Sequence, residues 1–362
     1  MKKTLLAAAA LPFLGALSLP LAAEDTPHPA PGEIVAQAKA GEWVAIPAED
    51  LLVMTLAPDA EGKARQVVIQ LMPAPFSQGW VQNIRLFARS GWYDNISVNR
   101  VQDNYVVQWG DPNYDNPEAT GETKKLPEGL KVVSEREYVV TDLLSIPDER
   151  GRPRLNYTLG AAMARNAMIA ANGGVAVPDG MAEALQNGSA PPAIAAPRMG
   201  DAYGSLATLL MGWPVAGDTT NFWPVHCYGM VGVGRNLSPD TGSGAELYTV
   251  IGHAPRHLDR NIALVGRVIE GMEHLSSLPR GKGALGFYAA DEVHRRTPIL
   301  TVRVASDLAP ADQPKFEYLS TEGETFARYA EARANRRDPF FNVPAGGADI
   351  CNVPVPIRRV AE

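Results

Sequence analysis

Residues 68–112 read VIQLMPAPFSQGWVQNIRLFARSGWYDNISVNRVQDNYVVQWGDP, and this stretch decides the fold. It opens with an apolar run that two prolines bring to an end. Apolar residues then recur at helical spacing over Val81–Ala88, and Gly91 is typical of a helix stop. Two β-type runs follow, Ile96–Val101 and Tyr105–Gly110, joined by short polar residues. We therefore predict a strand, a helix and a hairpin in this order.

Other runs with β-type patterning lie on both sides of this stretch. The chain has 33 glycines and 30 prolines among its 362 residues, which favours short strands and turns over helical bundles. Strands are predicted at 51–56, 66–72, 227–232, 245–252, 262–269 and 298–304. Residues 113–220 lose this rhythm, although a β-type run is predicted at 137–140 and an Ala-rich helix at 159–171. A charged helix is predicted at 323–337.

The N-terminus has the pattern of a secretory signal. Lys2 and Lys3 precede the apolar run Leu5–Leu21, which is too short to cross a bilayer, and small residues follow it. We predict cleavage after Ala23, a Pro- and Ala-rich tether over 24–49, and a periplasmic location. No later apolar run reaches the roughly 18 residues of a membrane helix, so no membrane span is expected.

Charge and cysteine content restrict the chemistry further. Removal of Lys2 and Lys3 with the signal lowers the formal charge from −7 to −9, so nucleic acid is not expected as a partner. The cysteines are Cys227 and Cys351. They form a disulfide in an oxidising compartment if the fold brings them together, or they remain two separate buried thiols. The sequence leaves both possibilities open.

Three separated segments resemble the cyclophilins in order and spacing. The first two are similar to the family's Ala-Arg-Ser-Gly-Phe-Tyr-Asp-Gly, Phe-His-Arg-Val and Gln-Gly-Gly-Asp-Pro runs. The segments are Val68–Leu71 with Ala74-Pro75 and Val81–Asn95, then Ser97–Val101 with Gln108–Pro112, and finally Gly229–Val231 with Gly244–Thr249, Leu258-Asp259 and Val265–Met272.

The resemblance implies a mostly β fold, a closed eight-stranded antiparallel barrel with two capping helices. The barrel would be discontinuous, formed by 50–112 and 221–310 around an insertion at 113–220, with a C-terminal extension at 311–362. The implied activity is peptidyl-prolyl cis-trans isomerisation without metal or cofactor. The implied partners are proline-containing unfolded or exported polypeptides.

The chemistry of this activity requires particular side chains. A peptide bond before proline is held planar by a barrier of about 18–20 kcal/mol, and no bond is broken when it rotates. A permanently charged donor aimed at the prolyl nitrogen favours the twisted state. By resemblance, Arg100 is this catalytic donor. Gln108 matches the amide that holds the substrate backbone during rotation.

The resemblance also assigns an apolar pocket for the proline ring. Its expected residues, all taken as substrate-binding, are Tyr105, Val106, Val231, Tyr248, His257 and Leu258. Several depart from the family pattern: Tyr105 and Tyr248 stand in place of phenylalanine, Val106 in place of methionine, and His257 in place of tryptophan. Glu246 stands where the family has glutamine. The Ala-Asn-Ala run of the family is matched to Val231-Gly232-Val233.

Other interpretations of the same residues stay open. The departures favour an alternative function, a non-catalytic binding or chaperone module for periplasmic partners. His253 and His257 have a spacing that can bind metal on a helix, but Pro255 lies between them and favours a loop, so no metal site is predicted. His226, beside Cys227, has no partner in the pattern.

Overall fold

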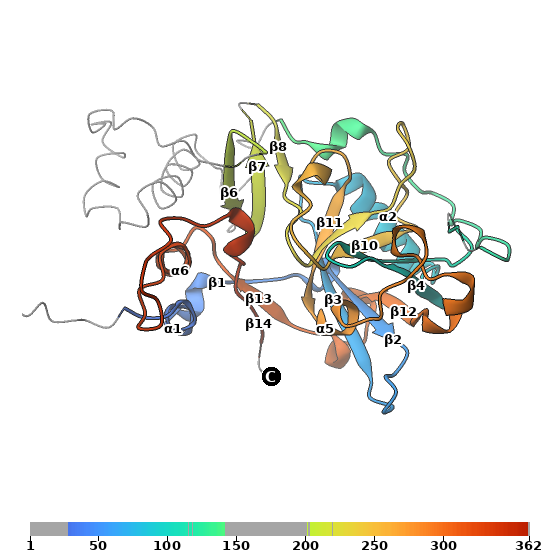
Figure 1. Cartoon of the computed structure of the whole chain (residues 1–362), viewed down its shortest axis with the longest axis horizontal. Helices are drawn as coiled ribbons and strands as arrows, with labels where there is room; N and C mark the ends of the chain where they lie inside the picture. Colours follow the sequence, from blue (N-terminus) through green and yellow to red (C-terminus); the bar gives the residue numbers. More distant parts are fainter. Residues whose placement is uncertain are drawn as a thin grey trace, which may run out of the picture.

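The computed structural model describes residues 28–114, 116–117, 119–141, 201, 203–218 and 220–360 (Figure 1). The predicted signal segment and the predicted helix at 159–171 lie outside these residues. In the described part, eight strands close into a barrel, and two smaller three-stranded sheets accompany it. The predicted antiparallel barrel is confirmed.

The barrel strands come from the two ranges in which β-type patterning is strongest. Neighbours in the barrel follow the order β10-β5-β4-β12-β2-β3-β11-β9, and β9 pairs with β10 to close it. All of these pairs are antiparallel. The bounds are β2 Leu51–Leu56, β3 Arg65–Leu71, β4 Ile96–Val101, β5 Val106–Gly110, β9 Met230–Val233, β10 Leu247–Val250, β11 Leu264–Glu270 and β12 Pro298–Val304.

Helix α2 (Gln78–Arg89) packs its apolar stripe on the barrel core. Trp80, Ile84 and Phe87 are completely buried in that core. The second helix of the barrel, α5 (Glu273–Ser276), is only one turn long and buries Leu275 in the same core. The two predicted capping helices are therefore very unequal.

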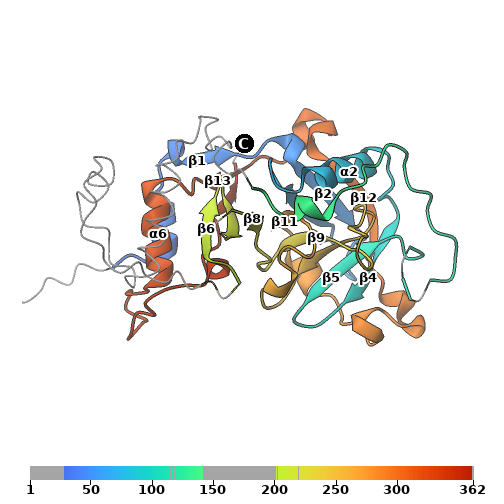
Figure 2. The same ribbon diagram turned by 90° about the horizontal axis from the view of Figure 1, so that it is seen from above.

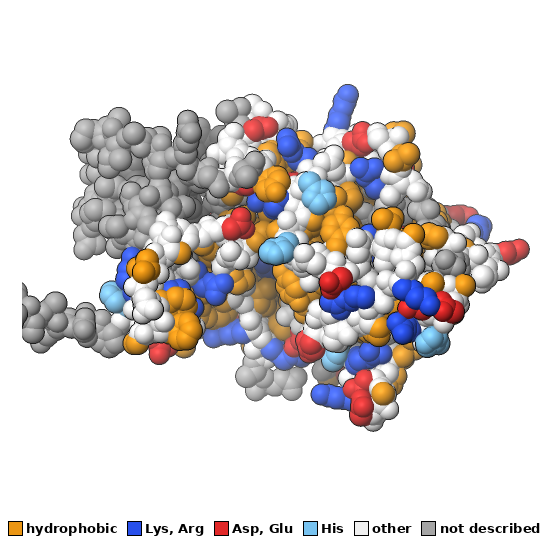
Figure 3. All heavy atoms as spheres, in the orientation of Figure 1, with side chains coloured by type: hydrophobic (Ala, Val, Ile, Leu, Met, Phe, Trp, Pro, Cys, Tyr) orange, Lys and Arg blue, Asp and Glu red, His pale blue; other side chains and the backbone are white. Residues whose placement is uncertain are grey.

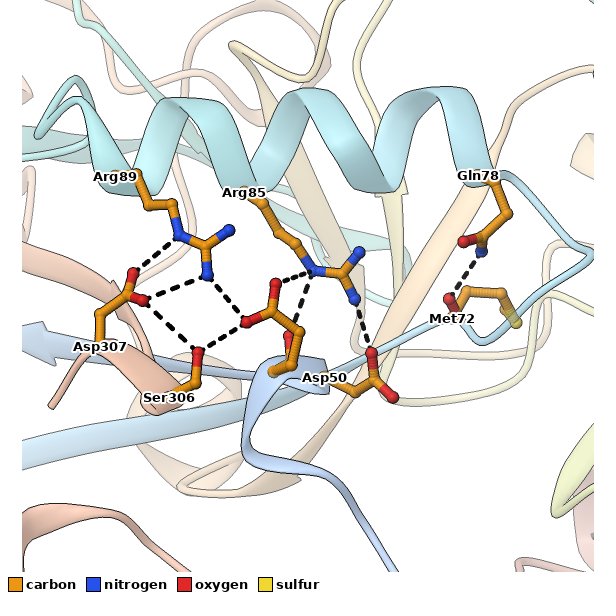
Figure 4. A network of polar contacts seen from close by, with 8 residues as sticks. Asp50, Met72, Gln78, Arg85, Arg89, Ser306 and Asp307 are labelled. Carbon is orange, nitrogen blue, oxygen red and sulfur yellow. Dashed lines mark hydrogen bonds and ion pairs between the residues drawn. The ribbon is translucent and has the colours of Figure 1, made fainter. Parts of the chain in front are cut away.

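The outer face of α2 is held by ion pairs (Figure 4). Arg85 donates to Asp50 at 2.6 Å, and Arg89 donates to Glu49 at 2.8 Å and to Asp307 at 2.9 Å. The hydrogen bond from Arg89 is the main reason why the pKa values of Glu49 and Asp307 are lowered. The two short 3₁₀ helices that contain these acidic residues, Ala48–Asp50 and Ala305–Asp307, are thereby bonded to α2.

The N-terminal segment is not the tether that its composition predicts. Helix α1 (Pro31–Ala36) packs beside α6 (Glu324–Ala334), the charged helix predicted near the C-terminus, at the end of the molecule away from the barrel (Figure 2). Strand β1 (Trp43–Ala45) pairs with β13 (Phe316–Leu319), which pairs in turn with β14 (Ile357–Arg359). The many Pro and Ala residues in 28–45 make its few apolar residues hard to recognise in the sequence. Ile34 is one of them, and it lies in a hydrophobic core.

The range predicted as an insertion contains two strands of a three-stranded meander that the sequence did not reveal, and the third strand follows directly after that range. The three strands are β6 (Leu206–Leu210), β7 (Trp213–Gly217) and β8 (Phe222–Pro224), and Figure 1 shows them between the barrel and α6. Met211 and Gly212 form the turn between β6 and β7, both with positive φ. The β-type run predicted at 137–140 is wrong for the most part, because Glu135–Tyr138 is a 3₁₀ helix and only Val140 makes a β-bridge.

A disulfide connects the barrel to the C-terminal segment. Cys227 lies just before β9 and Cys351 lies in the 3₁₀ helix Ile350–Asn352, with their α-carbons 5.1 Å apart. Of the two possibilities that the sequence left open, the structure has the bridged form.

No helix in the described residues is both long and apolar enough to traverse a bilayer. On the face drawn in Figure 3, acidic and basic side chains are interspersed, with hydrophobic side chains between them. This face therefore presents no large field of a single sign, the feature that favours binding to nucleic acid.

Candidate active site

A β-bulge in β4 sets the position of Arg100. The register between β4 and β5 shifts between Val98 and Arg100, so Asn99 is the extra residue. The Asn99 side chain is buried, accepts from Ser97 at 2.7 Å and donates to the Gly110 carbonyl at 3.1 Å. The bulge is thus fixed by buried hydrogen bonds, and it places Arg100 directly opposite Gln108.

Arg100 is held by three acceptors around its guanidinium. Its Nε donates to the Leu285 carbonyl at 2.7 Å, one terminal nitrogen donates to Gln108 Oε1 at 3.0 Å, and the other donates to Gln102. Its Cζ lies 5.6 Å from the ring centroids of Tyr105 and Phe287. Partial burial lowers the pKa of Arg100, and Tyr105 and Glu246 oppose this shift. An arginine nevertheless stays charged at any working pH.

Gln108 is fixed at both ends of its amide. Its Oε1 accepts from Arg100, and its Nε2 donates to Glu246 Oε2 at 2.6 Å. Arg100 can only donate, so the oxygen of the Gln108 amide must face Arg100 and its nitrogen must face Glu246.

A pocket of about 250 Å³ opens beside these polar groups. Its apolar wall comes from β5, β10 and the loop before β11, and its other side comes from the loop around Phe287. The residues that line it are Arg100, Tyr105, Val106, Gln108, Pro117, Gly234, Arg235, Glu246, Tyr248, Leu258, Ile262, Leu285 and Phe287. The volume is near the lower end of the range for ligand pockets and suits one small ring.

The structure brings six of the eight residues chosen from the sequence into this pocket. These are Arg100, Gln108, Tyr105, Val106, Tyr248 and Leu258.

Two of the chosen residues do not line the pocket. His257 is exposed and stacks on the outside of Tyr105, with ring centroids 6.4 Å apart. Val231 belongs to the buried core of the barrel, and its side chain does not line the pocket. Since side chains alternate along β9, Val231 and Val233 point inward, and the chain reaches the pocket only after the strand ends, at Gly234 and Arg235.

Gly232 is part of the site in another way. It pairs with Tyr248 across β9 and β10. A β-carbon at position 232 would lie 2.3 Å from Cζ and Oη of Tyr248, so the phenol ring lies directly over the glycine. Only glycine leaves room for this ring at the wall of the pocket.

Behind the pocket, Tyr248 is bonded to buried polar residues. His226 Nε2 lies 2.9 Å from the Tyr248 hydroxyl, and His226 Nδ1 lies 2.8 Å from Asp259 Oδ1. Arg256 Nε donates to Asp259 Oδ2 at 2.6 Å, and Arg256 also donates to Asp201 at 2.5 Å. We call these five residues the buried relay. The sequence pattern offers His226 no partner, because its partners lie far from it in the chain.

Burial sets the protonation of the relay. It lowers the pKa of His226 despite the opposing influence of Asp259, and it raises the pKa of Tyr248 well above its ordinary value. Burial also opposes the charge of Arg256, but its bonds to Asp201 and Asp259 are stronger and raise its pKa. At neutral pH the relay therefore contains a neutral imidazole and a neutral phenol.

Sequence reasoning missed Pro117, Gly234, Arg235, Leu285 and Phe287 as pocket residues. None of the five lies in a strand or an α-helix, so period-based patterns carry no signal for them. Within the described residues, no group of three or more His, Cys, Asp or Glu is placed to hold a metal ion.

Comparison with known proteins agrees with this architecture. The family described as cyclophilin type peptidyl-prolyl cis-trans isomerase/CLD matches residues 62–304. The cyclophilin AquaCyp293 from Hirschia baltica has a similar structure, with a TM-score of 0.54 and 17% identity, over 88% of this chain and 95% of that one. This likeness supports the fold. No curated protein matches the chain.

Two structures of a cyclophilin type peptidyl-prolyl cis-trans isomerase from Cryptosporidium parvum are also similar, one of them determined in the presence of the dipeptide Ala-Pro. Their TM-scores are 0.32 and 0.33 at 11% identity, over 69% and 70% of this chain and 97% and 96% of theirs. The family match covers well over half of the sequence, and its range contains seven of the eight barrel strands in full. The chain belongs to the cyclophilin family of peptidyl-prolyl cis-trans isomerases.

Proposed function

We propose that this chain is an active peptidyl-prolyl cis-trans isomerase that assists the folding of exported proteins. One observation carries the proposal: Arg100 and Gln108 are bonded to one another across β4 and β5, at 3.0 Å, beside an apolar pocket that suits a proline ring. These are the two side chains that the chemistry of prolyl rotation requires.

The geometry supports a division of tasks. In the twisted amide the prolyl nitrogen regains a lone pair, and a cationic donor stabilises it most strongly where water is excluded. Among the contacts of the described residues, Arg100 uses three of its five N–H groups, so others remain for a substrate. The Gln108 amide holds the peptide backbone on one side of the bond while the other side rotates.

The test is the rotation rate of a proline tetrapeptide with purified protein. Arg100→Ala should lower kcat/KM by about 100- to 1000-fold, the usual effect of removing one preorganised donor. Arg65→Ala is a matched control, because Arg65 also donates from a barrel strand to a backbone carbonyl, that of Ala57 at 2.7 Å, but outside the pocket. An unchanged rate for Arg100→Ala, with the fold intact by circular dichroism, would remove Arg100 from the mechanism.

A second function, a non-catalytic binding module, is favoured by one observation. The amide of Gln108 is occupied at both ends by Arg100 and Glu246, and His257 stands outside the pocket. If this function is the true one, the wild type gives no acceleration, yet it binds proline peptides and suppresses aggregation of an unfolded client. The same preparation in both assays separates the two functions.

We also propose that the chain is exported through a cleaved signal at 1–23. The charged and apolar pattern of that segment supports export, and the Cys227–Cys351 disulfide suits an oxidising compartment such as the periplasm. Fractionation of cells that express the full chain, followed by N-terminal sequencing, tests the location and the cleavage together. A chain recovered uncleaved from the cytoplasm would contradict the proposal.

A further inference from the structure

Tyr248 presents a problem of physical chemistry at the pocket wall. The wall has to be apolar to hold a proline ring, and Tyr248 packs there with Val106 and Val250. A phenol hydroxyl in such a wall costs free energy unless it is hydrogen-bonded. Tyr248 is only 5% exposed, so water is not a sufficient partner.

His226 supplies the partner from behind the wall. It is 1% exposed, its ring is nearly parallel to that of Tyr248 with centroids 6.3 Å apart, and its Nε2 lies 2.9 Å from the hydroxyl. The hydroxyl is therefore satisfied on the side away from the substrate. What the pocket receives is the carbon skeleton of the ring.

The other contacts of His226 determine which atom carries the proton. Asp259 Oδ1 accepts from the backbone N–H of His226 at 3.0 Å and lies 2.8 Å from Nδ1, while Arg256 donates to Oδ2. An ionised carboxylate can only accept, so Nδ1 carries the proton and Nε2 of the neutral ring is an acceptor. Tyr248 must then donate its O–H to His226.

We propose that His226 is a positioning residue for the isomerase site: its Nε2 accepts a hydrogen bond from the Tyr248 hydroxyl from behind, so that Tyr248 serves as an apolar wall. This inference rests on the proposed function. Asp259 and Arg256 act one step further back, since they fix the tautomer and the orientation of the imidazole. Through Arg256 the relay also reaches Asp201, and the Arg256 Cζ lies 5.0 Å from the ring centroid of Tyr203.

A double-mutant cycle on kcat/KM with the proline tetrapeptide tests the proposal. His226→Leu should lower kcat/KM by about tenfold, which corresponds to a loss of about 1.4 kcal/mol, because the hydroxyl is left without its partner. In a Tyr248→Phe background the same His226→Leu change should alter kcat/KM by less than twofold, because no hydroxyl remains to be satisfied. An equal loss in both backgrounds would overturn the proposal.

Conservative variants separate positioning from general structural support. His226→Gln can place an amide oxygen near the position of Nε2 and should retain most of kcat/KM. His226→Asn can keep only the bond to Asp259, so it should resemble His226→Leu. His274→Leu on α5, outside the pocket, is the control for a histidine-to-leucine change. A merely structural role predicts the same activity for His226→Gln and His226→Asn at equal melting temperature, and that result would refute the proposal.

A readout that does not need turnover keeps this test distinct from that of the proposed function. The ¹⁵N chemical shifts of the His226 ring should show a protonated Nδ1 and a bare, hydrogen-bonded Nε2, and Tyr248→Phe should shift Nε2 selectively. An inactive wild type with these shifts would defeat the isomerase function and the catalytic role of His226, but not the hydrogen bond. An active wild type with a protonated Nε2 would defeat the positioning role alone.

Discussion

Replacement of Gly232 by alanine should collapse the pocket wall. The new β-carbon would lie 2.3 Å from Cζ and Oη of Tyr248 and 2.7 Å from Cε1. These distances are far below van der Waals contact, and the backbone of β9 is fixed by pairing on both sides, with β10 and β11. The phenol ring must therefore move, and the available space is the pocket.

The cost of this change follows from two contributions. Overpacking a close-packed site costs about 1–3 kcal/mol. In the wild type the Tyr248 hydroxyl lies 2.9 Å from His226 Nε2, and loss of this hydrogen bond costs about 1 kcal/mol more. We therefore expect Gly232→Ala to lower the free energy of unfolding by about 2–4 kcal/mol, the sum of these two contributions, and to abolish most isomerase activity.

The assay is urea denaturation of four proteins: wild type, Gly232→Ala, Tyr248→Ala and the double variant. With the ring removed by Tyr248→Ala, a β-carbon at position 232 has room, so the second substitution should then cost little. Gly41→Ala is the control, since a β-carbon at position 41 meets no atom within 4 Å. If Gly232→Ala costs the same in both backgrounds, Tyr248 does not lie over Gly232 and our description of the wall is wrong.

Two further predictions concern stability. The Cys227–Cys351 disulfide joins residues 124 positions apart, and its reduction should lower the free energy of unfolding by about 3–5 kcal/mol. An unchanged urea midpoint after addition of reductant would show that the bond does not form. Arg89 lowers the pKa values of Glu49 and Asp307, so its contribution is present above their unfolded values near pH 4 and is lost as the pH falls through the lower folded values. Arg89→Met should therefore destabilise the protein by at most about 1 kcal/mol at neutral pH, because the ion pairs are exposed. The destabilisation should be smaller at pH 3, and thermal melts at both pH values check this.

The barrel strands were predicted well because each strand is a local pattern of the sequence, whereas their closure into a barrel was implied by the resemblance to the family. Most of them are short apolar runs bounded by turn residues, and the predicted bounds of β2, β4 and β12 are identical to those in the structure. Arg100 and Gln108 were also found, since the resemblance to the family fixed both positions.

The β6–β7 hairpin was missed for a local reason. Met211 and Gly212 both have positive φ, the conformation of a tight hairpin turn. Such turns usually have Asn or Asp first, and methionine conceals the signal. Val231 was placed at the pocket by resemblance alone. Residues 229–234 read Gly-Met-Val-Gly-Val-Gly, and this run does not by itself tell which of its apolar side chains point into the barrel.

The buried relay could not be predicted from the sequence for a different reason: the role of each member depends on contacts with the other members. A tyrosine at position 248 requires an acceptor for its hydroxyl and a glycine at position 232 beneath its ring.

A neutral histidine can be that acceptor only if Asp259 holds its other nitrogen, and this buried carboxylate requires Arg256 as its counter-charge. Taken singly, none of these residues indicates the others in the sequence. Loss of any one member should therefore leave the next one buried without its hydrogen-bond partner or counter-charge. This dependence explains why one phenol at the pocket wall is accompanied by a set of buried polar residues behind it.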